Sequence, residues 1–176
     1  DHGLSGKLRQ VEDWLRLARS NVIYFDGHGF RQAAGGISFA NGIAVSADGR
    51  KLYVASTTGL ALLAFDRDPE SGALGNRRDV SLGTAPDNVK LGDDGALWIG
   101  AHPKLLDFLG HAKDAAKPSP SQVLRILPEV NGGYGVNEVF LDDGKLLSGS
   151  SVAVACGKRM LVGPVFEDHF LDCTMK

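Results

Sequence analysis

The sequence is poor in cysteine, has no long hydrophobic run and carries no excess of positive charge. Its two cysteines, Cys156 and Cys173, share no CxxC spacing, which argues against a structural zinc site. The sequence leaves three states open for these cysteines: they pair with each other, they pair with another chain, or they stay reduced. The longest apolar stretches, such as residues 59–65, fall far short of the roughly 20 residues of a transmembrane helix, so no membrane span is predicted. Because 19 Lys and Arg stand against 21 Asp and Glu, a nucleic-acid partner is not expected either.

Several common catalytic motifs are also missing. The sequence contains no GxSxG around a serine, no GxxxxGK and no complete GxGxxG, and its five histidines never occur as HExxH. These absences argue against an α/β-hydrolase serine nucleophile, a P-loop nucleotide site and a zinc-protease helix. With 176 residues, 43% of them hydrophobic, the chain has the size and composition of one ordinary globular domain.

The clearest regularity is an Asp-Gly pair between two short apolar segments, which occurs three times, at residues 48–49, 94–95 and 143–144. The three glycines lie 46 and 49 residues apart (95 − 49 and 144 − 95). Alternating apolar residues around Asp-Gly are typical of a β-hairpin, because both turn positions tolerate a positive φ. A period in the forties with several strands per unit is typical of propeller blades.

The repeats predict an all-β protein with minor helices, which the hydrophobic spacing places near residues 8–19 and 104–116. At this period, residues 1–176 supply approximately three blades of a β-propeller. A closed ring needs about four to eight blades, and an incomplete one exposes strand edges and apolar faces. We therefore expect this chain to form about half of a single propeller domain and a separate chain to supply the other half.

Polar residues stand at the start of the strands that lead into the first two hairpins. They are Asn41 in the first copy and the adjacent Asp87 and Asn88 in the second, and Asn137 opens the third copy in the same way. In a propeller these positions lie on the innermost strands, beside the central channel. One carboxylate and two amide oxygens form a hard donor set, suited to Ca²⁺. Taken singly, the same residues are also ordinary turn formers.

Six stretches of the sequence resemble the paraoxonase and arylesterase family of calcium-dependent, six-bladed propeller lactonases. They follow the family's order and spacing along nearly the whole chain, but correspond only to the C-terminal half of the family's length. The stretches are residues 39–43 (FANGI), 87–89 (DNV), 97–103 (LWIGAHP), 121–125 (SQVLR), 149–152 (GSSV) and 161–166 (LVGPVF).

The resemblance implies a central channel that holds two calcium ions. By position, Asn41, Asp87 and Asn88 match ligands of the catalytic calcium, and Asp1 matches a ligand of the structural calcium. The family's other ligands and the histidine pair assigned as general base precede this chain, so the N-terminal half of the propeller is the expected partner. In the family an Asn comes directly before the position of Asp1. Two explanations are open for this start. Either such an Asn-Asp bond is cleaved and both pieces stay associated, or the chain is truncated.

The resemblance also places Phe39, His102, Ser151 and Val165 near the substrate pocket. For Phe39 and Val165 the alternative role is core packing, and for His102 it is a structural hydrogen bond. Ser151 stands where the family more usually has Thr. Residues 104–120 depart from the family in sequence and are interpreted as a lid over the channel.

Together these features predict a calcium-dependent hydrolase of lactones and aryl esters, in which the metal polarises the carbonyl for attack by water. One alternative is a gluconolactonase-like sugar-lactone hydrolase. Another is a non-catalytic propeller binding module that uses calcium for stability only. The resemblance favours a periplasmic or secreted location, while the residues themselves leave the compartment and the oligomeric state open.

Overall fold

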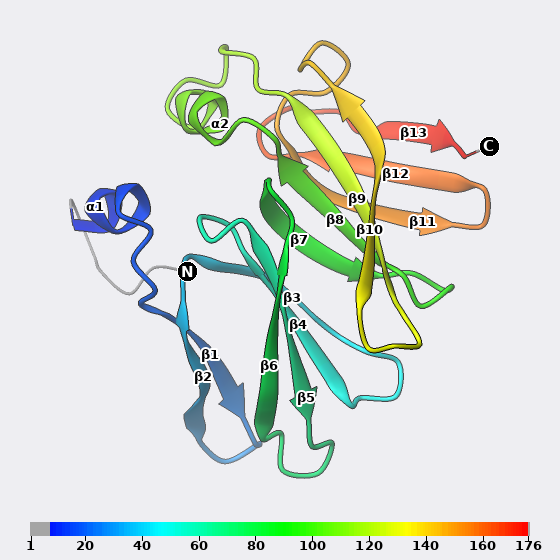
Figure 1. Ribbon diagram of the computed structural model, residues 1–176. Helices are drawn as coiled ribbons and strands as arrows, with labels where there is room; N and C mark the ends of the chain where they lie inside the picture. The colour runs from blue at the N-terminus through cyan, green and yellow to red at the C-terminus, as the bar shows by residue number, and fades with distance from the viewer. Residues whose placement is uncertain (1–7, 176) are drawn as a thin grey trace.

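The computed structural model of the protein describes residues 8–175 (Figure 1). The helices are α1 (Leu8–Trp14) and α2 (Leu105–His111). The strands are β1 (Ser20–Phe25), β2 (Phe30–Ile37), β3 (Ala40–Val45), β4 (Lys51–Ser56), β5 (Ala61–Arg67), β6 (Leu74–Ser81), β7 (Ala85–Leu91), β8 (Leu97–His102), β9 (Ser121–Pro128), β10 (Tyr134–Asp142), β11 (Ser150–Cys156), β12 (Arg159–Pro164) and β13 (Leu171–Thr174).

The strands form four antiparallel sheets in chain order. β3–β6 and β7–β10 are four-stranded, β11–β13 is three-stranded and β1–β2 is a two-stranded hairpin. The sheets follow one another from the lower left to the upper right of Figure 1. The first strands of successive sheets lie together, since β3 contacts β7 and β7 contacts β11. The predicted all-β class with minor helices is confirmed, and the chain forms partial propeller sheets.

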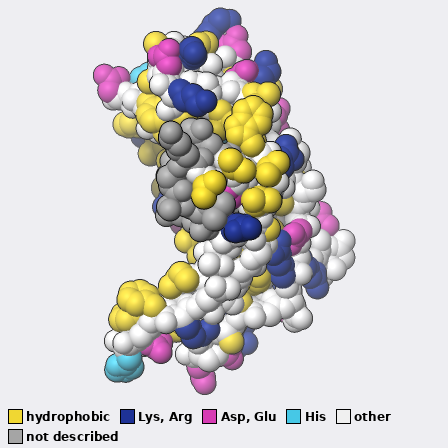
Figure 2. Space-filling view, turned by 90° about the vertical axis from the view of Figure 1, so that its left-hand side faces the viewer, with side chains coloured by type: hydrophobic (Ala, Val, Ile, Leu, Met, Phe, Trp, Pro, Cys, Tyr) yellow, Lys and Arg dark blue, Asp and Glu magenta, His cyan; other side chains and the backbone are white. Residues whose placement is uncertain are grey.

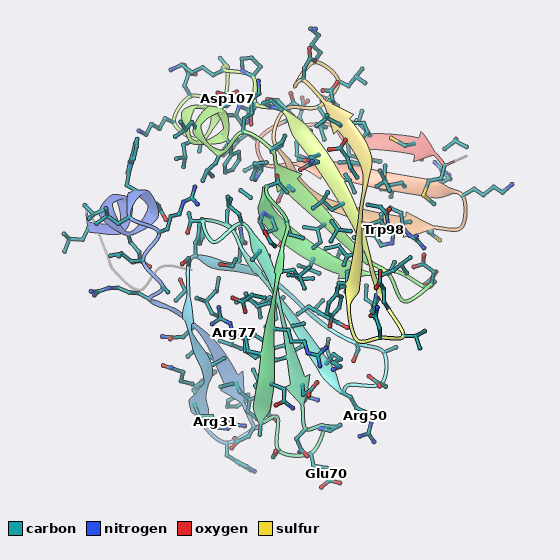
Figure 3. The ribbon with its side chains drawn as sticks, viewed as in Figure 1. Arg31, Arg50, Glu70, Arg77, Trp98 and Asp107 are labelled. Atoms are coloured by element: carbon teal, nitrogen blue, oxygen red, sulfur yellow. The ribbon has the colours of Figure 1, made fainter. Side chains whose placement is uncertain are left out.

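Each central sheet is buried on both faces, because alternate residues of a strand enter different cores. On β8, Leu97 and Ile99 pack towards the sheet of β3–β6, whereas Trp98 packs towards the sheet of β11–β13 (Figure 3). On β4, Tyr53 joins the first of these cores and Val54 joins the core shared with β1–β2. The sheets are therefore stacked face to face with a hydrophobic layer in each interval.

Two of the three predicted Asp-Gly hairpins are confirmed. The first joins β3 to β4, with Gly49 at φ 72°, and the second joins β7 to β8, with Gly95 at φ 77°. In both turns the aspartate side chain accepts a backbone N–H two residues later, Asp48 from Arg50 at 3.0 Å and Asp94 from Ala96 at 3.0 Å. Both hairpins begin with the innermost strand of their sheet, as the repeat predicts.

The third hairpin prediction is wrong. Asp143-Gly144 follows β10, the outermost strand of its sheet, and leads across to β11, so Asn137 lies on an outer strand and not beside a channel. The Asp142 carboxylate accepts hydrogen bonds from the backbone N–H groups of Gly144 and Leu146, at 2.9 and 3.0 Å. These bonds hold the chain in a loop instead of a returning strand.

Both helices are shorter than the segments with helical spacing. α1 ends at Trp14, and Arg16 adopts a left-handed φ of 50° that an α-helix cannot continue through. α2 ends at His111, whose Nδ1 lies 2.6 Å from the backbone oxygen of Lys117. Among the described residues, neither helix is long and apolar enough to cross a membrane.

The two cysteines are free thiols. Cys156 is exposed and Cys173 is half-buried, so the possibility that they pair with each other is not realised in the structure.

Candidate metal centre

The innermost strands β3 and β7 touch through their backbones at Gly42. A Cβ atom there would lie 2.5 Å from the oxygen of Asp87 and from the nitrogen of Val89, and 2.6 Å from Cα of Asn88. Only glycine fits so close an approach. It brings the neighbouring residue, Asn41, directly beside Asp87 and Asn88.

All three innermost strands are irregular at corresponding places. The pairing register shifts between Ala40 and Ile43 on β3, between Pro86 and Val89 on β7, and between Ser150 and Val152 on β11. Each shift places one extra residue on the inner strand, which is a β-bulge. Bulges bend a strand and redirect its side chains, and they are frequent next to active sites. The residues within these three bulges are Asn41 and Gly42, Asp87 and Asn88, and Ser151.

The Asp87 carboxylate is the centre of this group. The residue is only 8% exposed, and its Oδ1 accepts hydrogen bonds from Nδ2 of Asn41 at 2.7 Å and from Nδ2 of Asn88 at 3.3 Å. Its other oxygen, Oδ2, lies 3.6 Å from Nε2 of His102. In the described part of the chain, no lysine or arginine forms an ion pair with Asp87. A buried carboxylate whose partners are two neutral amides and one histidine, with no lysine or arginine, is costly to desolvate, so the position favours a bound cation.

The two amide groups turn their nitrogens towards the protein. A carboxylate can only accept hydrogen bonds, so the amide atom that faces Asp87 must be the nitrogen in both cases. The same nitrogens also reach the hydroxyl oxygens of Thr57, at 3.2 Å from Asn41, and Ser151, at 2.9 Å from Asn88. The amide oxygens make no hydrogen bond to any described residue and are therefore free to coordinate a metal ion.

The donor set fits a hard cation. It consists of one carboxylate and two amide oxygens, and within the described residues no three His, Cys, Asp or Glu side chains gather into a metal-binding group. Oxygen donors of this kind suit Ca²⁺. Since Ca²⁺ takes six to eight oxygens, these three side chains would supply only part of a coordination shell.

His102 connects the centre to α2. It is 1% exposed, and its ring is stacked on Phe108 of α2 at 3.4 Å between centroids and 10° between planes. Nδ1 of His102 is buried and has no hydrogen-bond partner among the described residues. The centre therefore lies at the α2 end of the sheets; in Figure 3, Asp107 marks that end, and Arg50 and Glu70 mark the opposite one.

Three further residues were predicted from the sequence to belong to the site: Phe39, Val165 and Asp1. Phe39 is half-buried in the turn before β3, with a left-handed φ of 49°, and its backbone oxygen accepts the N–H of Thr57 at 3.0 Å. Val165 follows β12 with 36% of its surface exposed, and no described contact joins it to Asp87. Asp1 lies outside the described residues. Their predicted roles stay predictions.

Two residues of the site were not found from the sequence. Thr57 and Phe108 act through contacts with residues distant in the chain, and neither belongs to a motif. Cavity size is no guide either, because the cavity of about 950 Å³ lined by Trp98, Arg125 and Met160 contains none of the site residues.

The chain is similar to several known proteins. It is 32% identical over 160 residues to serum paraoxonase/arylesterase 1 of Rattus norvegicus, covering 90% of this chain and 44% of the relative. It is 31% identical over 169 residues to serum paraoxonase/arylesterase 2 of the same species, covering 95% of this chain and 47% of the relative. The chain thus spans about half the length of the curated relatives it matches.

A solved structure shares the fold. It is that of a calcium-binding protein, regucalcin, from Agrobacterium tumefaciens, with a TM-score of 0.54 and 16% identity, covering 86% of this chain and 48% of the other. A family model described as Arylesterase matches residues 3–175. The chain therefore belongs to the arylesterase family.

Proposed function

We propose that this chain is the part of a calcium-dependent lactone and aryl-ester hydrolase that carries three ligands of the catalytic ion. The observation that carries the proposal is the buried Asp87 carboxylate, which has no lysine or arginine partner in the described part of the chain and is bracketed by the amides of Asn41 and Asn88. The relatives named paraoxonase/arylesterase support a hydrolase, and the likeness to a protein described as calcium-binding agrees with the metal.

The three side chains have different tasks. Asp87 supplies the negative charge that attracts the ion, while Asn41 and Asn88 coordinate through neutral oxygens and leave most of its charge in place. Bound there, Ca²⁺ would polarise the carbonyl of an ester or lactone and stabilise the oxyanion that forms when water attacks. His102 lies beside Asp87 and is proposed to line the substrate pocket, and Phe39, Ser151 and Val165 are proposed to contact the substrate. The general base and the other ligands belong to the rest of the ring, and Asp1 would serve a second, structural calcium.

The rest of the ring is proposed to be the N-terminal half of the same propeller, present as a separate chain. In the described part of the chain, the two end sheets, β1–β2 and β11–β13, have two and three strands, whereas the two central sheets have four. Both end sheets are therefore short of strands by comparison. Ile23 and Phe25 of β1 are 57% and 51% exposed, and Figure 2 shows hydrophobic side chains on this side of the molecule. An incomplete sheet can pair with further strands at its open edge, and an exposed apolar face can pack against a further sheet.

We expect the native protein to contain two polypeptides that stay together. Native mass spectrometry should give a complex heavier than the 18.6 kDa of this chain, and denaturation should release this chain and a companion of similar size. A stable, calcium-loaded particle of 18.6 kDa would contradict the companion. A single longer polypeptide would contradict separate chains.

Chelation is expected to remove activity reversibly. The assembled protein should hydrolyse a chromogenic aryl ester and a long-chain lactone, lose both activities in EDTA and recover them when Ca²⁺ is restored. Hydrolysis of sugar lactones alone would favour the gluconolactonase-like alternative. Unfolding on chelation, without hydrolysis of any ester or lactone, would favour the binding module.

A further inference from the structure

We propose that Thr57 is a positioning residue of the metal centre, which holds the Asn41 amide with its oxygen turned towards the ion. Thr57 follows β4 and is 2% exposed. The inference rests on the proposed calcium site, but concerns a residue that would not itself touch calcium or substrate.

Thr57 makes three hydrogen bonds that join both sides of the site. Its hydroxyl donates to the backbone oxygen of Pro86 at 2.7 Å, directly before Asp87. Its Oγ1 accepts from Nδ2 of Asn41 at 3.2 Å. Its backbone N–H donates to the oxygen of Phe39 at 3.0 Å, in the left-handed turn that precedes Asn41. One residue therefore fixes the strand that carries Asp87 and the strand that carries Asn41.

The direction of these bonds decides which atom of Asn41 faces the ion. A threonine hydroxyl has one proton, and Thr57 donates it in the hydrogen bond to the Pro86 oxygen. Towards any further partner, Oγ1 can therefore only accept a hydrogen bond. The atom of Asn41 that faces Thr57 must then be the amide nitrogen. Asp87 makes the same demand from the other side, at 2.7 Å. With both contacts satisfied by nitrogen, the oxygen of Asn41 is left for the metal; without Thr57, a single contact holds the amide.

A second buried threonine provides a matched control. Thr84, on the loop before β7, is 4% exposed, and its hydroxyl has no hydrogen-bond partner among the described residues. Replacing Thr84 with valine removes a buried hydroxyl of the same kind from the same region, but breaks no contact of Asn41 or Asp87. Partners that orient a metal ligand typically change metal affinity by about 10- to 100-fold when they are removed.

The test compares the parent with T57V, T57S and T84V in the assembled protein, this chain together with the rest of the ring. Calcium affinity is measured by isothermal titration, and thermal unfolding is followed in EDTA and in excess Ca²⁺. We expect T57V to bind Ca²⁺ about 10- to 100-fold more weakly and to show a smaller calcium-induced rise in Tm. T57S, which keeps the hydroxyl, should stay within about threefold of the parent, and T84V should match the parent.

Three results would overturn the inference: parent-like affinity in T57V, equal weakening in T57S and T57V, or equal weakening in T84V. If T57V does not fold, T57S and T57A isolate the same hydroxyl in a smaller side chain, and equal affinities in that pair would overturn it as well. A parent protein that binds no calcium would overturn the proposed function together with this inference. If the parent binds calcium, parent-like affinity in T57V overturns the role of Thr57 alone and leaves the proposed calcium site standing.

Discussion

Replacing Asp87 with asparagine is expected to abolish calcium binding and ester hydrolysis together. Asp87 carries the only negative charge among the three proposed ligands, and the asparagine side chain has nearly the same shape. Removing an outer partner of a metal ligand costs about 10- to 100-fold, so removing the charged ligand itself should cost at least about 100-fold in both calcium affinity and kcat/KM. Titration calorimetry and aryl-ester kinetics on the assembled protein measure the two losses.

Although it loses calcium binding, the same variant is expected to be at least as stable as the parent when no calcium is present. Without metal, the parent buries a carboxylate that has no lysine or arginine partner in the described part of the chain, whereas D87N buries a neutral amide there. The free energy of unfolding in EDTA is therefore expected to be equal or higher in D87N, since a buried charge held only by two neutral amides and a histidine costs more to desolvate than a neutral amide. A matched control is D79N, because Asp79 is exposed and pairs with Arg77 on the surface. Unfolding of D87N in EDTA, or calcium affinity equal to the parent's, would contradict the role.

The first two hairpins could be predicted because their signals are local. Asp48-Gly49 and Asp94-Gly95 carry within a few residues what a tight turn needs: a glycine with positive φ and an aspartate that accepts a nearby N–H. Asp143-Gly144 is the same dipeptide, but it connects β10 to β11 of the next sheet instead of joining two paired strands. There the preceding Asp142 binds the loop backbone, and Leu147, at 1% exposure, enters the core between β7–β10 and β11–β13. Tertiary packing overrides the local signal at that place.

The three residues proposed as metal ligands are also marked by local signals in the sequence. Asn41, Asp87 and Asn88 stand out because each opens a strand before a hairpin, and the resemblance marks the same positions. Which atoms face one another depends on bulges that the hydrophobic pattern does not reveal, because a bulge adds a residue without changing composition. Thr57, the proposed positioning residue, donates a hydrogen bond to Pro86, 29 residues further along the chain. Such a contact exists only once the sheets are stacked.

The backbone contact at Gly42 makes that position very sensitive to a single methyl group. The three nearest atoms around an added Cβ are all main-chain atoms, at 2.5–2.6 Å, and belong to the strand that carries Asp87 and Asn88. A flexible side chain can rotate away from such an intrusion, but a strand held in a four-stranded sheet cannot. β3 and β7 would have to separate, and this would move Asn41 away from Asp87.

Gly42→Ala should therefore destabilise the protein and weaken calcium binding at the same time. Overpacking costs about 1–3 kcal/mol and occasionally more, and with backbone on the receiving side we expect about 3 kcal/mol or above, measured by urea unfolding of the assembled protein. The matched control is Gly75→Ala on β6, where nothing lies within 4 Å of the added Cβ and φ is not positive. That change should be neutral or stabilise by about 0.4–1 kcal/mol, because it restricts the unfolded chain. If G42A were as stable as G75A and bound calcium like the parent, the inner strands could not be in contact. The arrangement of Asn41, Asp87 and Asn88 as one metal centre would then be wrong, because only the contact between β3 and β7 brings Asn41 beside the other two residues.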